Sequence, residues 1–354
     1  VIWGMLLAAT PHTFYAIFAL LKYNRAQFLM PLGPVFDADR LVLITLSMIS
    51  IGVVGLVIWD GVFPDRRDVR VLGVLPIPTL RFVLGRLASL GRVLVLFATP
   101  LCLLQSVAFG LTVTGFGAPI SRIHGITAHF ATVALACAFV FCALITAQCL
   151  LLLLFGRRAA QAASVTFQVL FAVGLVQLLY FLPDVARILR GGGASNGEFS
   201  TLAALPPAWF FGLYKQLAGT ADANSAALGS LAVELTIGAA ITAVGLYAAS
   251  YDRLSQRALE GVAPRASAFR PTVRSRWLAG PLRRPVTDAV RAFTIQTLFR
   301  SRTHRMMFAV YGGFALAVIL SSAVSIALRN HGAGLWQPGI SMKSVPLVAQ
   351  FLVL

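Results

Sequence analysis

The chain has 354 residues, of which 58% are hydrophobic and 12% are charged, and its mean hydropathy is +0.84. Soluble domains carry roughly 25% charged residues, so this composition excludes an ordinary soluble protein and predicts one that uses the lipid bilayer as solvent. The net charge is +17 at pH 7. The chain starts at Val1 and ends within an apolar run at Leu354, so we expect a fragment that lacks both ends.

Long apolar stretches follow one another along the chain. A helix needs about 20 apolar residues to cross a bilayer. Stretches that reach or begin such a length cover residues 1–21, 41–59, 93–121, 125–156, 159–183, 228–251, 306–328 and 344–354. They are too long for barrel strands and lack strict alternation, which favours helices. We therefore expect an all-α, polytopic membrane protein with about eight transmembrane helices.

The positions of arginine and lysine predict which side of the membrane each loop faces. Alternate loops at 63–92, 156–160 and 251–305 hold 20 of the 29 cations. Loops rich in these residues stay in the cytoplasm. This distribution explains the basic charge without a nucleic-acid partner, and we expect none.

The cytoplasmic loop after the second apolar stretch predicts one short charged helix. Pro64 suits the first helical position, Asp65 and Asp68 fall in the first turn, and Gly73 suits the C-terminal cap. On the residues alone, the loop is either an ordinary solvated connection or a docking element for a cytoplasmic partner. The string Asp-Arg-Arg-Asp is not specific enough to decide between them.

The outer loop before the sixth stretch contains an aromatic segment, residues 202–219. Its aromatic side chains are of the kind found at membrane interfaces: Trp209, Phe210, Phe211 and Tyr214. Pro206 and Pro207 would end one helix and start another. The segment therefore predicts either two short helices that dip into the outer leaflet or a single interfacial helix.

The polar residues 251–286 are typical of a cytoplasmic linker, and residues 287–305 of a basic amphipathic helix. The expected organisation is a six-span domain at 1–250, this linker, and a region at 287–354. That last region would hold the amphipathic helix and two spans of a second unit.

Motifs for nucleotide binding, serine hydrolysis and zinc binding are absent from the sequence. The four cysteines lie in apolar runs and are expected to be buried small hydrophobes. Glu234 lies inside the sixth stretch, where a carboxylate is a functional candidate, although near an interface it can simply reach lipid headgroups. We interpret His12 and His129 as structural.

The order of these elements resembles the membrane subunits of ABC-2-type ABC exporters. That family has six spans per unit, a coupling helix between spans two and three, short helices dipping in between spans five and six, and an elbow helix before span one. Here the matching segments are 64–73, 202–219 and 287–305. The strings Phe-Pro-Asp-Arg-Arg-Asp and Leu-Pro-Pro-Ala-Trp-Phe-Phe-Gly-Leu-Tyr are also similar to bacterial permeases of this type.

The resemblance implies a permease subunit of an ATP-driven exporter in the bacterial cytoplasmic membrane. Such a subunit is not itself an enzyme and holds no cofactor, because ATP is bound by a separate ABC ATPase. Its partners would be that ATPase, the lipid bilayer, and either a second permease unit or a second copy of the chain. The ATPase would dock on Asp65, Arg66, Arg67, Asp68, Arg70, Leu72 and Gly73. The substrate path or outer gate would involve Glu234, Trp209, Phe210 and Tyr214.

Two other functional classes stay open at this point. An ion-coupled secondary transporter needs ionisable groups inside the membrane, for which Glu234 and the histidines are the candidates. A polytopic membrane enzyme needs clustered polar residues at one membrane face. The sequence shows no such cluster, so this class ranks third.

Overall fold

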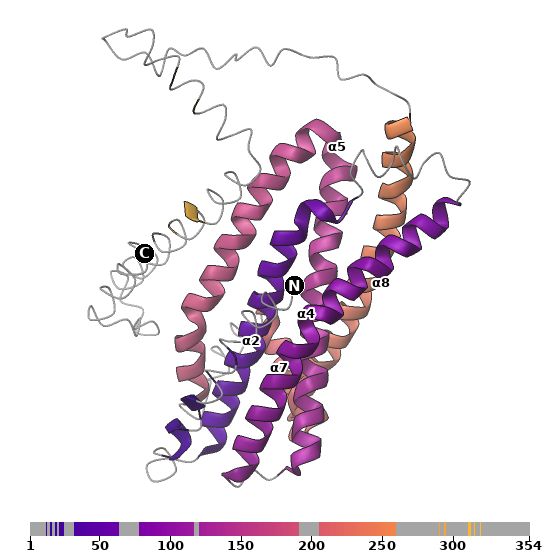
Figure 1. Ribbon diagram of the computed structural model, residues 1–354. Helices are drawn as coiled ribbons and strands as arrows, with labels where there is room; N and C mark the ends of the chain where they lie inside the picture. The colour runs from indigo at the N-terminus through magenta and orange to yellow at the C-terminus, as the bar shows by residue number, and fades with distance from the viewer. Residues whose placement is uncertain are drawn as a thin grey trace, which may run out of the picture.

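The computed structural model describes residues 32–63, 78–116, 120–190 and 205–259, with short pieces between 12 and 24 and single residues between 290 and 319. The regular structure in the four long ranges is helical. It comprises α2 (Leu32–Ile58), the 3-10 turn η1 (Trp59–Gly61), α4 (Thr79–Gly115), α5 (Arg122–Arg190), α7 (Pro206–Leu217) and α8 (Ala223–Leu259). Figure 1 shows the long helices packed side by side as a bundle. The predicted all-α class is confirmed for the described part of the chain.

Four of these helical segments are long and apolar enough to cross a membrane: Leu32–Ile58, Leu80–Gly115, Arg122–Phe155 and Ala223–Tyr251. A shorter apolar segment spans Thr166–Leu178. These segments make the chain an integral membrane protein. The stretches expected at 1–21, 306–328 and 344–354 lie almost wholly outside the described residues, so a total of about eight spans stays a prediction.

Helix α5 has 69 residues and folds back on itself, as Figure 1 shows at the top of the view. The contacts of Trp59 demonstrate the reversal. Its carbonyl oxygen accepts a hydrogen bond from Gln148 at 2.6 Å, and its indole N–H donates to Ser164 at 2.6 Å. In a straight helix those two partners would be roughly 24 Å apart. The first arm matches the predicted fourth span, and the second holds the shorter apolar segment where the fifth span was predicted. The chain reverses between Gln148 and Ser164, around the connection predicted at 156–160, although the backbone there is helical.

Helix α2 contacts both arms of α5 at two glycines. A Cβ atom on Gly52 would lie 3.1 Å from Leu175 of the returning arm, and one on Gly55 would collide with Leu144 of the first arm. Small residues allow membrane helices to approach closely where packing, and not water exclusion, drives association. The C-terminal half of α2 therefore packs closely against both arms of α5.

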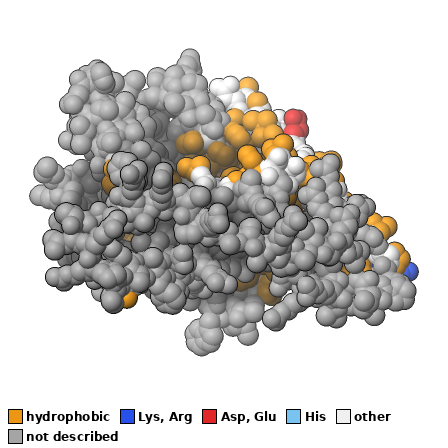
Figure 2. Space-filling view, turned by 90° about the horizontal axis from the view of Figure 1, so that it is seen from above, with side chains coloured by type: hydrophobic (Ala, Val, Ile, Leu, Met, Phe, Trp, Pro, Cys, Tyr) orange, Lys and Arg blue, Asp and Glu red, His pale blue; other side chains and the backbone are white. Residues whose placement is uncertain are grey.

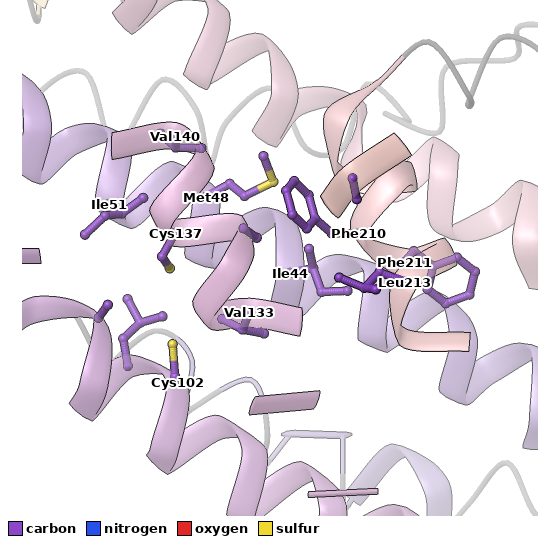
Figure 3. Close-up of a cluster of buried hydrophobic side chains, with 14 of the residues drawn as sticks. Ile44, Met48, Ile51, Cys102, Val133, Cys137, Val140, Phe210, Phe211 and Leu213 are labelled. Atoms are coloured by element: carbon purple, nitrogen blue, oxygen red, sulfur yellow. The ribbon is translucent and has the colours of Figure 1, made fainter. Parts of the chain in front are cut away.

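An apolar core joins α2, α4, α5 and α7, as seen in Figure 3. Its labelled members are Ile44, Met48, Ile51, Cys102, Val133, Cys137, Val140, Phe210, Phe211 and Leu213. Cys102, Cys137 and Cys149 are buried free thiols, which confirms the prediction of small hydrophobes, and Cys142 is partly buried.

Apolar side chains also face outward. Leu80 and Val95 of α4 are 66% and 62% exposed, and Ile241 of α8 is 68% exposed. Figure 2 shows the described surface in that view as mostly apolar. Such a surface is the one that a bilayer covers, because lipid tails are the solvent for these side chains.

Two predicted boundaries differ from the structure. α2 begins at Leu32 instead of residue 41, so the expected loop at 22–40 is helical from Leu32 onward. The earlier start places Asp37, Asp39 and Arg40 inside a candidate membrane helix. α8 continues to Leu259, into the range expected as linker. The remainder of that linker lies outside the described residues.

Candidate functional site: the outer polar cluster

Charged and aromatic side chains are buried together at one end of the bundle, where α2 and α5 begin, α4 ends and α7 packs. The arginine distribution predicts that this end faces outward, and we call it the outer end. We call the set the outer polar cluster; it comprises Lys22, Asp37, Asp39, Arg40, Phe109, His129, Tyr214 and Lys215. Asp39 is 0% exposed and Arg40 is 6% exposed. Charged groups are almost never this buried unless paired, and inside a membrane they mark functional sites by default.

Lysine and tyrosine side chains donate hydrogen bonds to the Asp39 carboxylate. The Lys22 ammonium lies 2.5 Å and 2.6 Å from its two carboxylate oxygens, and the Tyr15 hydroxyl donates to it at 2.8 Å. The Lys22 side chain is 21% exposed. These bonds attach the residues around Lys22 to α2 through a buried, charge-assisted contact, the stronger class of hydrogen bond.

Arg40 lies against two aromatic rings. Its guanidinium carbon is 3.7 Å from the centroid of Tyr214 on α7 and 5.4 Å from that of Phe109 on α4. Its Nη1 atom donates to Asp37 at 3.2 Å. Asp37 also faces Lys215 of α7 at 3.6 Å, so two cations share this carboxylate. Desolvated cation–π contacts of this kind contribute about 2 kcal/mol, and they join α7 to α2.

Tyr214 keeps its proton in this environment. Burial raises the pKa of its phenol, and the neighbouring Arg40 acts in the opposite direction. A neutral phenol ring presents its negative face to the guanidinium without adding a second charge, which suits the stacked geometry.

His129 lies at the centre of the same group. It is 1% exposed, and its ring centroid is 5.6 Å from Phe109 and 6.1 Å from Tyr214. Within the described part of the chain, neither ring nitrogen has a hydrogen-bond partner, and neither does Nε of Arg40.

Polar groups continue inward from the cluster along α4 and α2. Gln105 donates to the Ser47 hydroxyl at 2.8 Å, and both residues are 0% exposed. The Oε1 atom of Gln105 and the hydroxyl of Ser106 are further buried groups without a partner among the described residues.

Helix α7 is held against α8 by close backbone contact. It starts at Pro206, in agreement with the prediction that the two prolines begin a helix. A Cβ atom on Gly212 would lie 2.5 Å from the carbonyl oxygen of Ser225 and 3.1 Å from the backbone nitrogen of Gly229. The described residues hold one short helix in this loop, and residues 202–204 lie outside them.

The residues predicted for an outer gate differ in their burial. Phe210 and Tyr214 are buried in the bundle, and Trp209 is partly buried with its ring edge-on to Phe139 at 6.1 Å. Glu234 is exposed on α8 and is not a member of the outer polar cluster. The predicted ATPase-docking residues lie outside the described residues, so their role stays a prediction: Asp65, Arg66, Arg67, Asp68, Arg70, Leu72 and Gly73.

The burial of Asp39 and Arg40 is not predicted by the sequence analysis, because charged residues between apolar stretches indicate a loop. The helical spacing of Phe36, Arg40 and Leu43, all buried in the structure, was the available signal. Comparisons with protein-family models, curated proteins and solved structures found no match. The site is therefore interpreted from its own chemistry.

Proposed function

We propose that this chain is the permease subunit of an ATP-driven exporter of the ABC-2 type in the bacterial cytoplasmic membrane. It would hold a six-span unit and the start of a second, about eight spans in all. The observation that supports the proposal is the position of α7. This short helix lies between the returning arm of α5 and α8, and it packs into the outer end of the bundle. The family arrangement places short dipping helices between its fifth and sixth spans.

The inner end of α2 suits transmission from a docked ATPase. The proposed docking loop follows Phe63 directly, and the residues before it are anchored to two other helices. Tyr247 of α8 donates to the carbonyl oxygen of Val62 at 3.1 Å, and Arg86 of α4 donates to the same oxygen at 3.3 Å. Displacement of the loop would therefore move α2, α4 and α8 together.

Helix α2 then connects this inner end to the outer polar cluster. ATPase closure would act on one end of α2, and the contact of Arg40 with Tyr214 would pass the displacement to α7. Such coupling requires that docking favour one of two bundle arrangements over the other.

Charge reversal in the docking loop tests the proposal. Arg66→Glu with Arg67→Glu is expected to abolish most of the ATP hydrolysis that the chain stimulates in an ATPase co-purified from native membranes. Membrane insertion should be intact. Arg92→Glu, an exposed arginine of α4 outside the proposed docking residues, is the matched control. Unchanged stimulation in the double variant would remove this loop from the mechanism.

A second candidate is an ion-coupled secondary transporter, which the buried Lys22–Asp39 pair favours because coupling uses intramembrane ionisable groups. The same purification separates the two. A single chain without ATPase activity, whose proteoliposomes carry protons down a gradient without ATP, would support the transporter and contradict the exporter.

A further inference from the structure

Two buried donor groups of the outer polar cluster have no acceptor within the described part of the chain. They are Nε of Arg40 and the imidazole of His129, on residues 6% and 1% exposed. A neutral imidazole carries one N–H donor and one acceptor nitrogen, so His129 leaves both unused. Buried polar groups without a partner are rare in native proteins, and a bound water molecule or ion often satisfies those that the protein itself does not.

These groups belong to one location. The Arg40 guanidinium and the His129 ring both contact the rings of Phe109 and Tyr214. The four residues come from α2, α5, α4 and α7, respectively. Residues of four helices therefore surround the unpartnered groups of Arg40 and His129, and the rings of Phe109 and Tyr214 are their apolar neighbours.

The local charges favour an anion as the partner of these donors. Asp37, the carboxylate bonded to Arg40, is shared with Lys215, and Asp39 accepts two short contacts from Lys22. The buried guanidinium is therefore only partly neutralised. A water molecule would satisfy hydrogen bonds but not this charge, and a cation would be repelled by it.

The shape of the free donors points to an oxyanion. Arg40 uses Nη1 for Asp37, and its Nε atom has no partner among the described residues. The planar fork of arginine matches the oxygen spacing of carboxylates and phosphates. His129 would add a further N–H.

We propose that Arg40 and His129 form a binding site for a small oxyanion, a phosphate or a carboxylate, enclosed by α2, α4, α5 and α7. The proposal goes beyond transport by an ATPase and does not depend on it. The oxyanion is either free in solution or part of a lipid headgroup, since the site lies at the outer end of the bundle.

The test measures the thermal unfolding temperature, Tm, of the purified full chain in detergent after delipidation. Sodium phosphate and sodium acetate are compared with sodium chloride at equal ionic strength and pH. A ligand that binds only the folded state raises Tm with the logarithm of its concentration. We expect a rise of about 2–4 °C with at least one oxyanion relative to chloride.

Two variants and one control make the result specific. Arg40→Lys keeps the charge but removes the fork, and His129→Leu replaces a buried ring with an apolar side chain. Both should lose the oxyanion-dependent rise. Arg86→Lys, an arginine-to-lysine substitution at the inner end of the bundle, is the control and should keep the oxyanion-dependent rise in Tm. An equal Tm in oxyanion and chloride, for a wild type that retains no bound phosphorus, would overturn the proposal, as would a rise that survives in both site variants.

A phosphorus assay distinguishes the two sources. Bound phosphorus retained by the wild type through detergent washing, and lost in Arg40→Lys, would assign the site to a lipid headgroup. A site without retained phosphorus, but stabilised by added phosphate or acetate, would assign it to a free oxyanion.

Discussion

The outer half of α2 is held in the bundle by ion pairs and ring stacking, whereas its inner half is held by close packing and two hydrogen bonds. In the outer half, Asp39 and Arg40 bond to Lys22 and stack on Tyr214, respectively. In the inner half, Gly52 and Gly55 contact both arms of α5, and Trp59 bonds to each arm.

The two halves of α2 associate with the bundle through different interactions. Lipid tails are as apolar as the side chains, so helices in a membrane associate through fitted packing, which the inner half uses. Buried ion pairs carry a desolvation cost that can exceed their attraction, so the charges of the outer half are a weak source of stability. Their burial agrees with the ligand-binding role proposed above.

The largest expected effect comes from removing one charge of the outer half. Asp39→Asn leaves the largely buried Lys22 ammonium without its carboxylate, and breaking such a pair costs about 3–5 kcal/mol. The measurement is the unfolding free energy by denaturant titration in mixed micelles. The double variant Lys22→Gln with Asp39→Asn removes both charges and should recover most of the loss. No recovery would mean that the pair does not act as a unit.

An intermediate effect is expected where α7 meets α8. Gly212→Ala forces a methyl group against the carbonyl oxygen of Ser225, and overpacking of this kind costs about 1–3 kcal/mol. The same titration measures it. Gly238→Ala on α8 is the matched control, because nothing lies within 4 Å of its Cβ position. Equal stability of the two variants would show that α7 is not tightly docked.

The smallest effect is expected in the inner half. Ser164→Ala keeps the stack of Trp59 on Phe167, 5.2 Å away, and removes the acceptor of the indole N–H. The cost should be about 1 kcal/mol by the same titration. Trp59→Phe should cost more, because the smaller ring loses the hydrogen bond and also leaves a cavity. Unchanged stability of Ser164→Ala would mean that this bond does not secure the returning arm of α5.

Lowering the pH should change the stability of the α7–α8 region much less than the substitutions above. The Ser225 hydroxyl donates to Asp222 and holds the pKa of that carboxyl below its usual range. The stabilisation from this hydrogen bond is fully present above the pKa that Asp222 has in the unfolded chain. It is lost as the pH falls through the lower pKa that Asp222 has in the folded protein. Asp222 lies at the surface, so the effect is small.

Much of the fold could be predicted because it follows from local composition. The apolar runs of α4, α5 and α8 require helices, since each backbone group in lipid needs a partner within its own segment. Pro206 predicts the start of α7, and apolar neighbours predict the burial of Cys102 and Cys137. The start of α2 could not be predicted in this way, because Asp37, Asp39 and Arg40 resemble the end of a loop when read alone.

The sequence by itself determined that this chain is an α-helical membrane protein, because 58% hydrophobic residues in long runs have no other stable solvent. The place where its buried charges meet depends on how the helices pack. Arg40, Phe109, His129 and Tyr214 are far apart along the chain, and the burial of each depends on the others. A charge is tolerated inside the bundle only when partners from other helices surround it, and no local pattern of residues reveals those partners.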